Sequence, residues 1–137
     1  MADDKIEIRN LYKVFGDNPK TKMQHVHAGM SKQELLDQHD HVLGLRDINI
    51  KVRSKRIQVI MGLSGSGKST LIRHINRLIE PTEGEVIVDG EDVLSMSTEG
   101  LRDFRRHKAS MVFQRFGLLP HRTVTQNVAY GLTLQGI

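Results

Sequence analysis

Three glycines and a lysine stand together in GLSGSGKS, residues 62–69, between an apolar run and a run with helical periodicity. This spacing matches the phosphate-loop pattern, in which glycines let the backbone turn with its amide groups facing inward. Successive N–H groups and the start of the following helix then bind an anion, while Lys68 reaches the terminal phosphates and Ser69 holds a magnesium ion. The pattern predicts a nucleotide site, and a plain glycine-rich turn is the weaker interpretation.

The base of the nucleotide is not identified by this loop. The chain contains no Asn-Lys-x-Asp run of the kind that reads guanine, so adenine is favoured by default. Phe15 lies on the parity opposite to the apolar residues of its segment, just before Gly16 and a polar loop, and can stack on a base. Tyr12 shares the parity of Ile6 and Ile8, so we interpret it as a core residue.

Alternating strands and helices are expected to position these residues. Apolar alternation or continuous apolar runs predict strands at 6–15, 45–52, 57–61, 85–88 and 109–114. The run IQVIM, residues 57–61, is typical of a strand buried on both faces. Helices are predicted at 69–79, 98–107 and 123–132, and the turn residues Asp89 and Gly90 predict the end of a hairpin. The expected fold class is α/β, with an antiparallel element at the N-terminus.

Two of these segments carry finer predictions. In 69–79, Leu71, Ile72, Ile75 and Ile79 are expected on one buried helical face. Residues 17–44 form an insertion between two strands, in which 17–30 is expected to be turn-like and polar. Ser31 and Glu34 have the spacing of a capping box, which predicts a short helix directly after Ser31.

Composition limits the classes of protein. The 137 residues are enough for about one domain, and 38% hydrophobic with 26% charged residues is typical of a soluble protein. The longest apolar stretches are too short to cross a bilayer, the first residues lack the charged-then-apolar pattern expected of a leader, and no cysteine is present. The formal net charge is +4, and the basic residues are concentrated in 51–56 and 102–108. Neither cluster has interleaved aromatic residues, so we expect solvated surfaces and no nucleic-acid partner.

Four stretches together resemble a known family. LYKVFG, MGLSGSGKST, NRLIEPTEGEVIVDGEDV and MVFQRFGLLPHRTVTQNVAYGL are similar to the first half of an ABC-transporter ATPase subunit. The insertion at 17–44 and the leucine of MGLSG resemble the ATPases of glycine betaine, proline betaine and choline importers. The resemblance implies a P-loop NTPase (RecA-like) core with an N-terminal antiparallel β element. It covers nearly the whole chain.

The resemblance also implies roles for individual residues. Lys68 and Gln114 match catalytic positions, and Ser69 and Gln114 match positions beside the magnesium ion. Gln114 opens a glutamine loop at 114–121, and its neutral amide can both donate to and accept from water. Its segment from Arg115 to His121 matches the surface that meets the transmembrane permease subunit. ATP is expected to contact Phe15, Gly62, Ser64, Gly65, Ser66, Gly67, Lys68, Ser69 and Thr70.

The same resemblance implies a second ATPase subunit as a homodimer partner and a location on the cytoplasmic face of the cell membrane. RSKR, residues 53–56, stands where the family has a glycine-glutamate turn. The LSGGQ motif, the acidic strand and the switch histidine of the family's second half have no counterpart before Ile137. We therefore expect an N-terminal fragment or truncated product that binds ATP without hydrolysing it, with an uncovered edge at 57–61.

Some alternatives remain open. Asp89 ends EVIVD and could imitate a catalytic acid, although Gly90 follows it and the hairpin interpretation is favoured. HVH at 25–27 and HDH at 39–41 could ligate a metal, but solvated histidines in a polar insertion are the favoured interpretation. Three functions are compatible with the sequence: an importer ATPase, a small-molecule kinase, and a nucleotide-binding module without catalysis.

Overall fold

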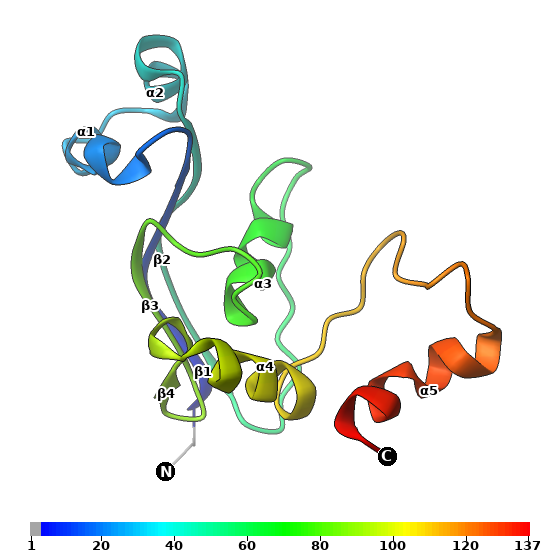
Figure 1. Ribbon diagram of the computed structural model, residues 1–137. Helices are drawn as coiled ribbons and strands as arrows, with labels where there is room; N and C mark the ends of the chain where they lie inside the picture. The colour runs from blue at the N-terminus through cyan, green and yellow to red at the C-terminus, as the bar shows by residue number, and fades with distance from the viewer. Residues whose placement is uncertain (1–3) are drawn as a thin grey trace. The chain divides into compact units, whose positions relative to one another are not determined.

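The computed structural model describes residues 4–137, which divide into two compact units, one up to Ser95 and one from Met96 to Ile137. The first contains β1 (Asp4–Phe15), the 3-10 turn η1 (Pro19–Lys22), α1 (Met23–His27), α2 (Lys32–His39), β2 (Val42–Arg53), α3 (Lys68–Ile75), β3 (Glu83–Val88), β4 (Glu91–Asp92) and η2 (Val93–Ser95). The second contains α4 (Thr98–His107) and α5 (Val124–Gln135), coloured yellow to red in Figure 1. No helix within residues 4–137 has the length and apolar character needed to cross a membrane.

One antiparallel sheet forms the first unit, with strand order β2-β1-β3-β4. Ile8 of β1 pairs with Ile50 of β2 on one side and with Val86 of β3 on the other. The strands predicted at 6–15, 45–52 and 85–88 and the antiparallel N-terminal element are confirmed. The predicted hairpin end is confirmed as well, because Asp89 and Gly90 form the turn between β3 and β4.

A bulge interrupts the alternation of β1 at Asn10, whose backbone is left-handed at φ 44°. The N–H of Asn10 donates to Oδ1 of Asn49 at 2.8 Å instead of joining the strand ladder. The register shift turns Leu11 into the core, where simple alternation from Ile8 would place it outside. Gly84 of β3 faces this bulge, and a Cβ there would lie 2.5 Å from the Asn10 carbonyl oxygen.

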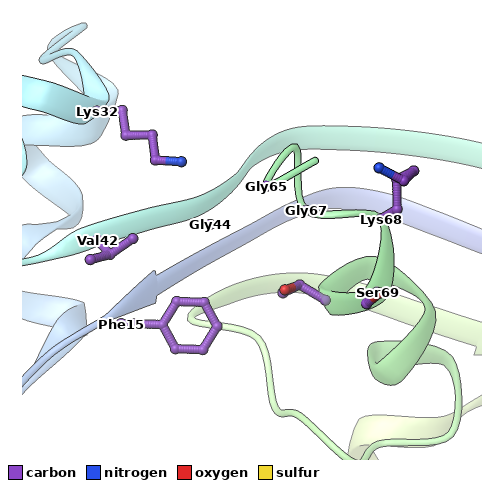
Figure 2. Close-up of a pocket in the computed structure, with 9 residues that line it drawn as sticks. Phe15, Lys32, Val42, Gly44, Gly65, Gly67, Lys68 and Ser69 are labelled. Carbon is purple, nitrogen blue, oxygen red and sulfur yellow. The ribbon is translucent and has the colours of Figure 1, made fainter. Parts of the chain in front are cut away.

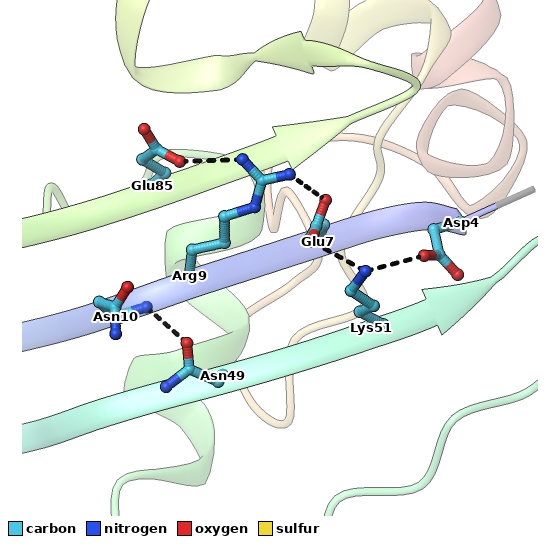
Figure 3. A network of polar contacts seen from close by, with 7 residues as sticks. All are labelled: Asp4, Glu7, Arg9, Asn10, Asn49, Lys51 and Glu85. Atoms are coloured by element: carbon cyan, nitrogen blue, oxygen red, sulfur yellow. Dashed lines mark hydrogen bonds and ion pairs between the residues drawn. The ribbon is translucent and has the colours of Figure 1, made fainter.

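The outer face of the sheet carries a ladder of charged side chains (Figure 3). Arg9 of β1 pairs with Glu7 at 2.7 Å and with Glu85 of β3 at 3.4 Å, while Lys51 of β2 pairs with Glu7 at 3.1 Å. The hydrogen bond from Arg9, and then that from Lys51, holds the pKa of Glu7 below its ordinary value. The ladder makes the pairing of the strands on this solvated face electrostatically favourable.

The insertion at 17–44 contains more helix than predicted. α2 begins after Ser31 with the reciprocal capping box to Glu34, as expected. Residues 17–30 were expected to be turn-like, and this was wrong, because η1 and α1 lie there. α1 has only five residues, so Met23 and Val26 are too few to give a helical period in the sequence.

The core of the insertion is a cluster in which every member is at most 7% exposed. Its members come from β1, α1, α2 and β2: Val14, Met23, Val26, Leu35 and Leu43. Tyr12 and Met30 pack against it. The cluster places the two insertion helices against the end of the β1–β2 pair, and it agrees with the interpretation of Tyr12 as a packing residue.

The strands predicted at 57–61 and 109–114 are not formed. Ile57 is 94% exposed and Met61 86%, so IQVIM is extended chain without cover. The physical reason is that a strand buried on both faces needs hydrogen-bonded neighbours, and the sheet described in residues 4–137 offers neither segment a partner. RSKR, just before the first of these segments, makes a turn in which Lys55 is left-handed at φ 57°.

The predicted helices form, with differences at their ends. α3 spans Lys68–Ile75 instead of 69–79, because the chain turns at Arg77, whose φ is 52°. The buried face also differs, since Leu71 and His74 are buried while Ile72 is exposed. In the second unit, α4 spans Thr98–His107 as predicted, and Ser97 is its N-cap. The Thr123 capping box starts α5, which runs slightly longer than predicted.

Candidate functional site

The loop before α3 has the backbone that the glycine pattern predicts. Gly65 and Gly67 have positive φ, 76° and 96°, in the left-handed region that favours glycine. Gly67 is the N-cap of α3, and the first helical amide bond runs from Leu71 N–H to its carbonyl oxygen at 2.9 Å. The amides of the first turn precede that bond and have no intrahelical acceptor, so they can bind an anion.

Two glycine positions of this loop, Gly62 and Gly67, have no room for a side chain. A Cβ on Gly62 would lie 2.7 Å from Oγ of Ser66, and one on Gly67 would lie 2.9 Å from the carbonyl oxygen of Gly44 in β2. Ser66 N–H donates to Leu63 O at 3.2 Å and closes the turn. The loop is therefore a tight structure packed against β2, and side chains at these positions would displace it.

Lys68 folds back over the loop. Its ammonium donates to the carbonyl oxygens of Gly62 and Leu63, both at 2.7 Å, and to Oγ of Ser66 at 3.3 Å. These oxygens gather the cation at the mouth of the loop, where phosphate oxygens are the expected ligands. Ser69 follows it at the exposed start of α3, with its hydroxyl at the cavity described next.

A cavity of about 260 Å³ joins this loop to the end of the β1–β2 pair (Figure 2). The loop and helix residues Gly65, Gly67, Lys68, Ser69 and Thr70 line one part of it, and Phe15, Lys32, Val42 and Gly44 line the other. Gly62 and Ser66 belong to the loop but do not line this cavity. Ser64 is exposed at its tip and does not line this cavity.

Phe15 has the position that its parity predicted. Its side chain is 39% exposed at the end of β1, opposite Val42 in the register with β2. Gly44 lets the ring lie close, because a Cβ there would be 2.7 Å from Cε2 of Phe15. The Lys13 ammonium stands 5.0 Å from the ring centroid and donates to Glu80 O at 2.8 Å. Burial lowers the pKa of Lys13, with the Glu80 carboxylate opposing that shift.

The site therefore combines an anion-binding loop with an aromatic ring at the other end of one cavity. A model of the family described as ABC transporter matches residues 45–135, more than half of the chain. The chain belongs to the ABC transporter family. It is 49% identical over 97% of its length to the glycine betaine/proline betaine transport system ATP-binding protein of Escherichia coli strain K12, covering 33% of that protein.

Other relatives agree with this assignment of the chain to the ABC transporters. The glycine betaine transport ATP-binding protein of Bacillus subtilis strain 168 is 47% identical over 97% of the chain, which covers 32% of that protein. The chain thus spans about a third of the length of these curated relatives. The chain also resembles the solved structure of the ATP-binding cassette MJ0796, a dimer in a post-hydrolysis state bound to ADP and Pi, with a TM-score of 0.74 and 29% sequence identity. The match covers 95% of this chain and 47% of the MJ0796 chain.

These matches confirm the predicted family and the P-loop ABC ATPase fold. The chain covers about half of the cassette that has this fold. The two predicted strands that are not formed, at 57–61 and 109–114, are local differences from the expected elements. The relation to ATP-binding proteins of osmoprotectant transport is confirmed at the level of sequence.

Gln114 lies in the second unit of this ABC chain, in the extended stretch after α4, and is exposed. Residues 115–121 follow it, and within them Phe116 is left-handed at φ 58° and almost fully exposed. Gln114 and residues 115–121 belong to the second unit, whereas all residues that line the cavity belong to the first. The roles of Gln114 at magnesium and of Arg115 to His121 at a permease remain predictions.

The end of that loop is organised by one side chain that the sequence did not single out. Asn127 of α5 accepts from Leu119 N–H at 2.8 Å and donates to Leu119 O at 3.1 Å and to Thr123 O at 3.0 Å. A mostly apolar hollow of about 380 Å³ lies beside it, lined by Leu118, Leu119, Pro120, Arg122, Val124, Asn127 and Val128. The sequence gives only a weak signal for this role, namely an asparagine in the first turn of a largely apolar helix.

His74 was missed as well. It is fully buried in α3, with Nδ1 2.7 Å from Thr70 O and Nε2 without a hydrogen-bond partner. Burial lowers its pKa, the Thr70 carbonyl raises it and the Lys13 charge lowers it further. The neutral form is favoured, so His74 is a core residue of α3, the helix that follows the phosphate loop. An apolar helical pattern with one histidine gives no sequence signal for this burial.

Three histidines of the insertion contact other side chains. His25 and His39 stack at 4.4 Å between ring centroids, and His27 bonds Glu83 at 2.8 Å. Within residues 4–137 no group of three His, Cys, Asp or Glu side chains could hold a metal ion. Asp89, in the turn between β3 and β4, forms an ion pair with Lys5 of β1 at 2.6 Å.

Proposed function

We propose that this chain supplies the nucleotide-binding part of an ABC importer ATPase that powers uptake of quaternary-ammonium osmoprotectants such as glycine betaine. The observation that supports ATP binding is the single cavity that carries the phosphate loop at one end and Phe15 at the other. The names of the relatives support the solute class, since they are glycine betaine transport proteins.

In this proposal the first-turn amides of α3 and Lys68 bind the β- and γ-phosphates. Lys68 exchanges the carbonyl oxygens of Gly62 and Leu63 for phosphate oxygens, and the loop serines with Thr70 add hydroxyl and amide donors. The exposed Ser69 hydroxyl fits a hard cation, so it would hold Mg²⁺, whose chemistry is to neutralise the phosphate charge. The adenine ring stacks on Phe15.

The second unit would supply residues that act on water and on partner proteins. Gln114 would orient water near the metal, and the loop from Arg115 to His121, with the apolar hollow behind it, would meet the transmembrane permease on the cytoplasmic face of the membrane. A second copy of the ATPase would complete the site, as in the dimeric cassettes that the chain resembles. The chain by itself would bind ATP without turnover.

Two other functions compete with this one. A phosphate-loop kinase would need an acceptor pocket with a basic lid, and only 102–106 resembles one. A nucleotide-binding module without catalysis describes the same cavity without partners. The relation to importer ATPases favours the first function over both.

Calorimetric titration of the chain with Mg-ATP tests the site. Lys68→Ala should abolish measurable binding, while Lys20→Ala, an exposed lysine outside the cavity, should leave the affinity unchanged. Equal affinity in the Lys68 variant would refute the assignment of the phosphate loop.

A cellular measurement tests the transport role. Lys68→Ala in the chromosomal copy should reduce uptake of labelled glycine betaine at high osmolarity to the level of a deletion strain. Normal uptake in that strain, with ATP binding lost in vitro, would mean that the chain serves another ABC transporter.

A further inference from the structure

The cavity contains a second cation that no role yet covers. We propose that Lys32, in the 17–44 insertion, is a nucleotide-binding residue whose ammonium group contacts the α-phosphate. This inference rests on the proposed ATP site and adds to it a ligand outside the phosphate loop.

The charges around the cavity support this role. Lys32 and Lys68 are the two cationic side chains that line it, and the remaining lining residues are neutral. Lys68 is held by three oxygens of its own loop. Lys32 is exposed, and the described structure records no hydrogen bond or ion pair for its ammonium group. A polyanionic ligand entering the cavity would be the natural partner for this cation.

The stability of α2 gives no reason for a lysine at this position. Lys32 is the first residue of α2 after the Ser31 N-cap. A cation in the first turn opposes the helix dipole, which favours acidic residues there. Glu34 of the same turn already satisfies the capping box. A benefit from outside the helix, such as contact with an anion, accounts for the lysine better.

The start of α2 is firmly held. The capping box fixes the first turn, and Leu35, one turn further on, is completely buried in the insertion cluster. His41 closes the base of the insertion through bonds to His39 O at 2.6 Å and Asp17 O at 2.7 Å. Arg46 of β2 donates to the carbonyl oxygen of Met30, just before the helix. These contacts reduce the entropy lost when Lys32 binds a ligand.

The direction of the side chain selects the α-phosphate. Figure 2 shows Lys32 on the side of Val42, with its ammonium extending toward the phosphate loop. Phe15 at that end would stack on the base, and Lys68 at the other end would bind the terminal phosphates. The α-phosphate is the anionic group between these two ends of a nucleoside triphosphate, so the ammonium is assigned to it.

The test is a calorimetric titration of the full chain with Mg-ATP and with Mg-ADP for Lys32→Gln, Lys32→Arg and Lys20→Gln. Lys20 is the matched control, because it is an exposed lysine of the same insertion that does not line the cavity. We expect Lys32→Gln to weaken both nucleotides by the same factor, about threefold to tenfold as for an exposed charge-assisted contact. Lys32→Arg should restore most of the loss.

Each other outcome overturns the assignment. Equal affinities for Lys32→Gln and Lys20→Gln would show that Lys32 makes no contact, and a loss for ATP alone would place it at the γ-phosphate. Lys68→Ala in the same series separates the two proposals. If it abolishes binding while Lys32→Gln has no effect, the ATP site stands and only the role of Lys32 fails.

Discussion

Two apolar regions that precede the phosphate loop in the chain differ completely in burial. In the insertion, the five cluster residues from β1, α1, α2 and β2 are all nearly inaccessible. In IQVIM, directly before the loop, Ile57 is 94% exposed and Val59 64%. By hydrophobicity alone the second segment is the better candidate for burial. The difference teaches that apolar side chains are buried only where the backbone beside them also finds partners.

The insertion meets that condition locally. Its helices satisfy their own amides, and its two flanking strands pair with each other from Phe15 and Val42 onward. IQVIM has to find hydrogen-bonding neighbours elsewhere, and the sheet within residues 4–137 pairs β2, β1, β3 and β4 without it. The aromatic end of the cavity therefore lies on the packed insertion cluster, while the phosphate loop leads into α3 and contacts β2.

The largest predicted effect separates the two regions through Leu35. Leu35→Ala should lower the free energy of unfolding by about 2–5 kcal/mol, because it leaves a cavity in a closed cluster. Leu36→Ala, on the same helix but 40% exposed, is the matched control and should stay within about 0.5 kcal/mol. Urea unfolding followed by circular dichroism measures both. Equal small losses would show that the insertion is no better packed than IQVIM.

The second prediction sharpens the comparison at the site itself. Phe15→Ala should weaken Mg-ATP binding by about 1–3 kcal/mol, the contribution of a stacked base. Binding of inorganic triphosphate should not change, since it lacks the base. Titration of both ligands with one protein sample measures the difference. Equal losses would indicate that the variant damaged the phosphate loop, and stacking on Phe15 would be rejected.

Much of the fold followed from local signals in the sequence. The capping box at Ser31 and the Asp-Gly turn at residue 89 are short-range features, and each formed as predicted. The register of β1 could not be predicted, because the bulge at Asn10 depends on Asn49 of another strand. The strand at 57–61 failed for the same kind of reason, since pairing partners are not a property of the segment.

The candidate site shows the same division. The loop at 62–69 and the parity of Phe15 were readable because glycine spacing and strand alternation are local. Lys32 was not predicted, because only the packing of the insertion brings α2 to the cavity. The burial of His74 was likewise hidden, since the helix packs through Leu71 and His74 and leaves Ile72 outside.

The third prediction uses pH to probe the buried face of α3, the helix that follows the phosphate loop. Burial lowers the pKa of His74 in the folded chain. At a pH below the ordinary histidine pKa of about 6.5, the unfolded chain therefore binds a proton at this residue more readily than the folded chain does. Stability should therefore fall as pH falls through that region, by at most about 1.4 kcal/mol per pH unit from this group. Thermal unfolding of the chain and of His74→Gln between pH 7.5 and about 5.5 measures the difference. An identical pH slope in the variant would show that His74 titrates freely when folded.

The smallest predicted effect comes from the exposed segment. Replacing Ile57 and Val59 together by serine should change the free energy of unfolding by no more than about 0.5 kcal/mol, because neither side chain is removed from water. The same change should reduce self-association in sedimentation velocity, since an uncovered apolar run promotes contact between copies. The control is the pair Ile72→Ser and Leu78→Ser, at two partly exposed apolar positions of the α3 region, which should leave self-association unchanged. A loss of several kcal/mol for the 57 and 59 pair would instead mean that IQVIM is buried in solution, and the contrast between the two regions would disappear.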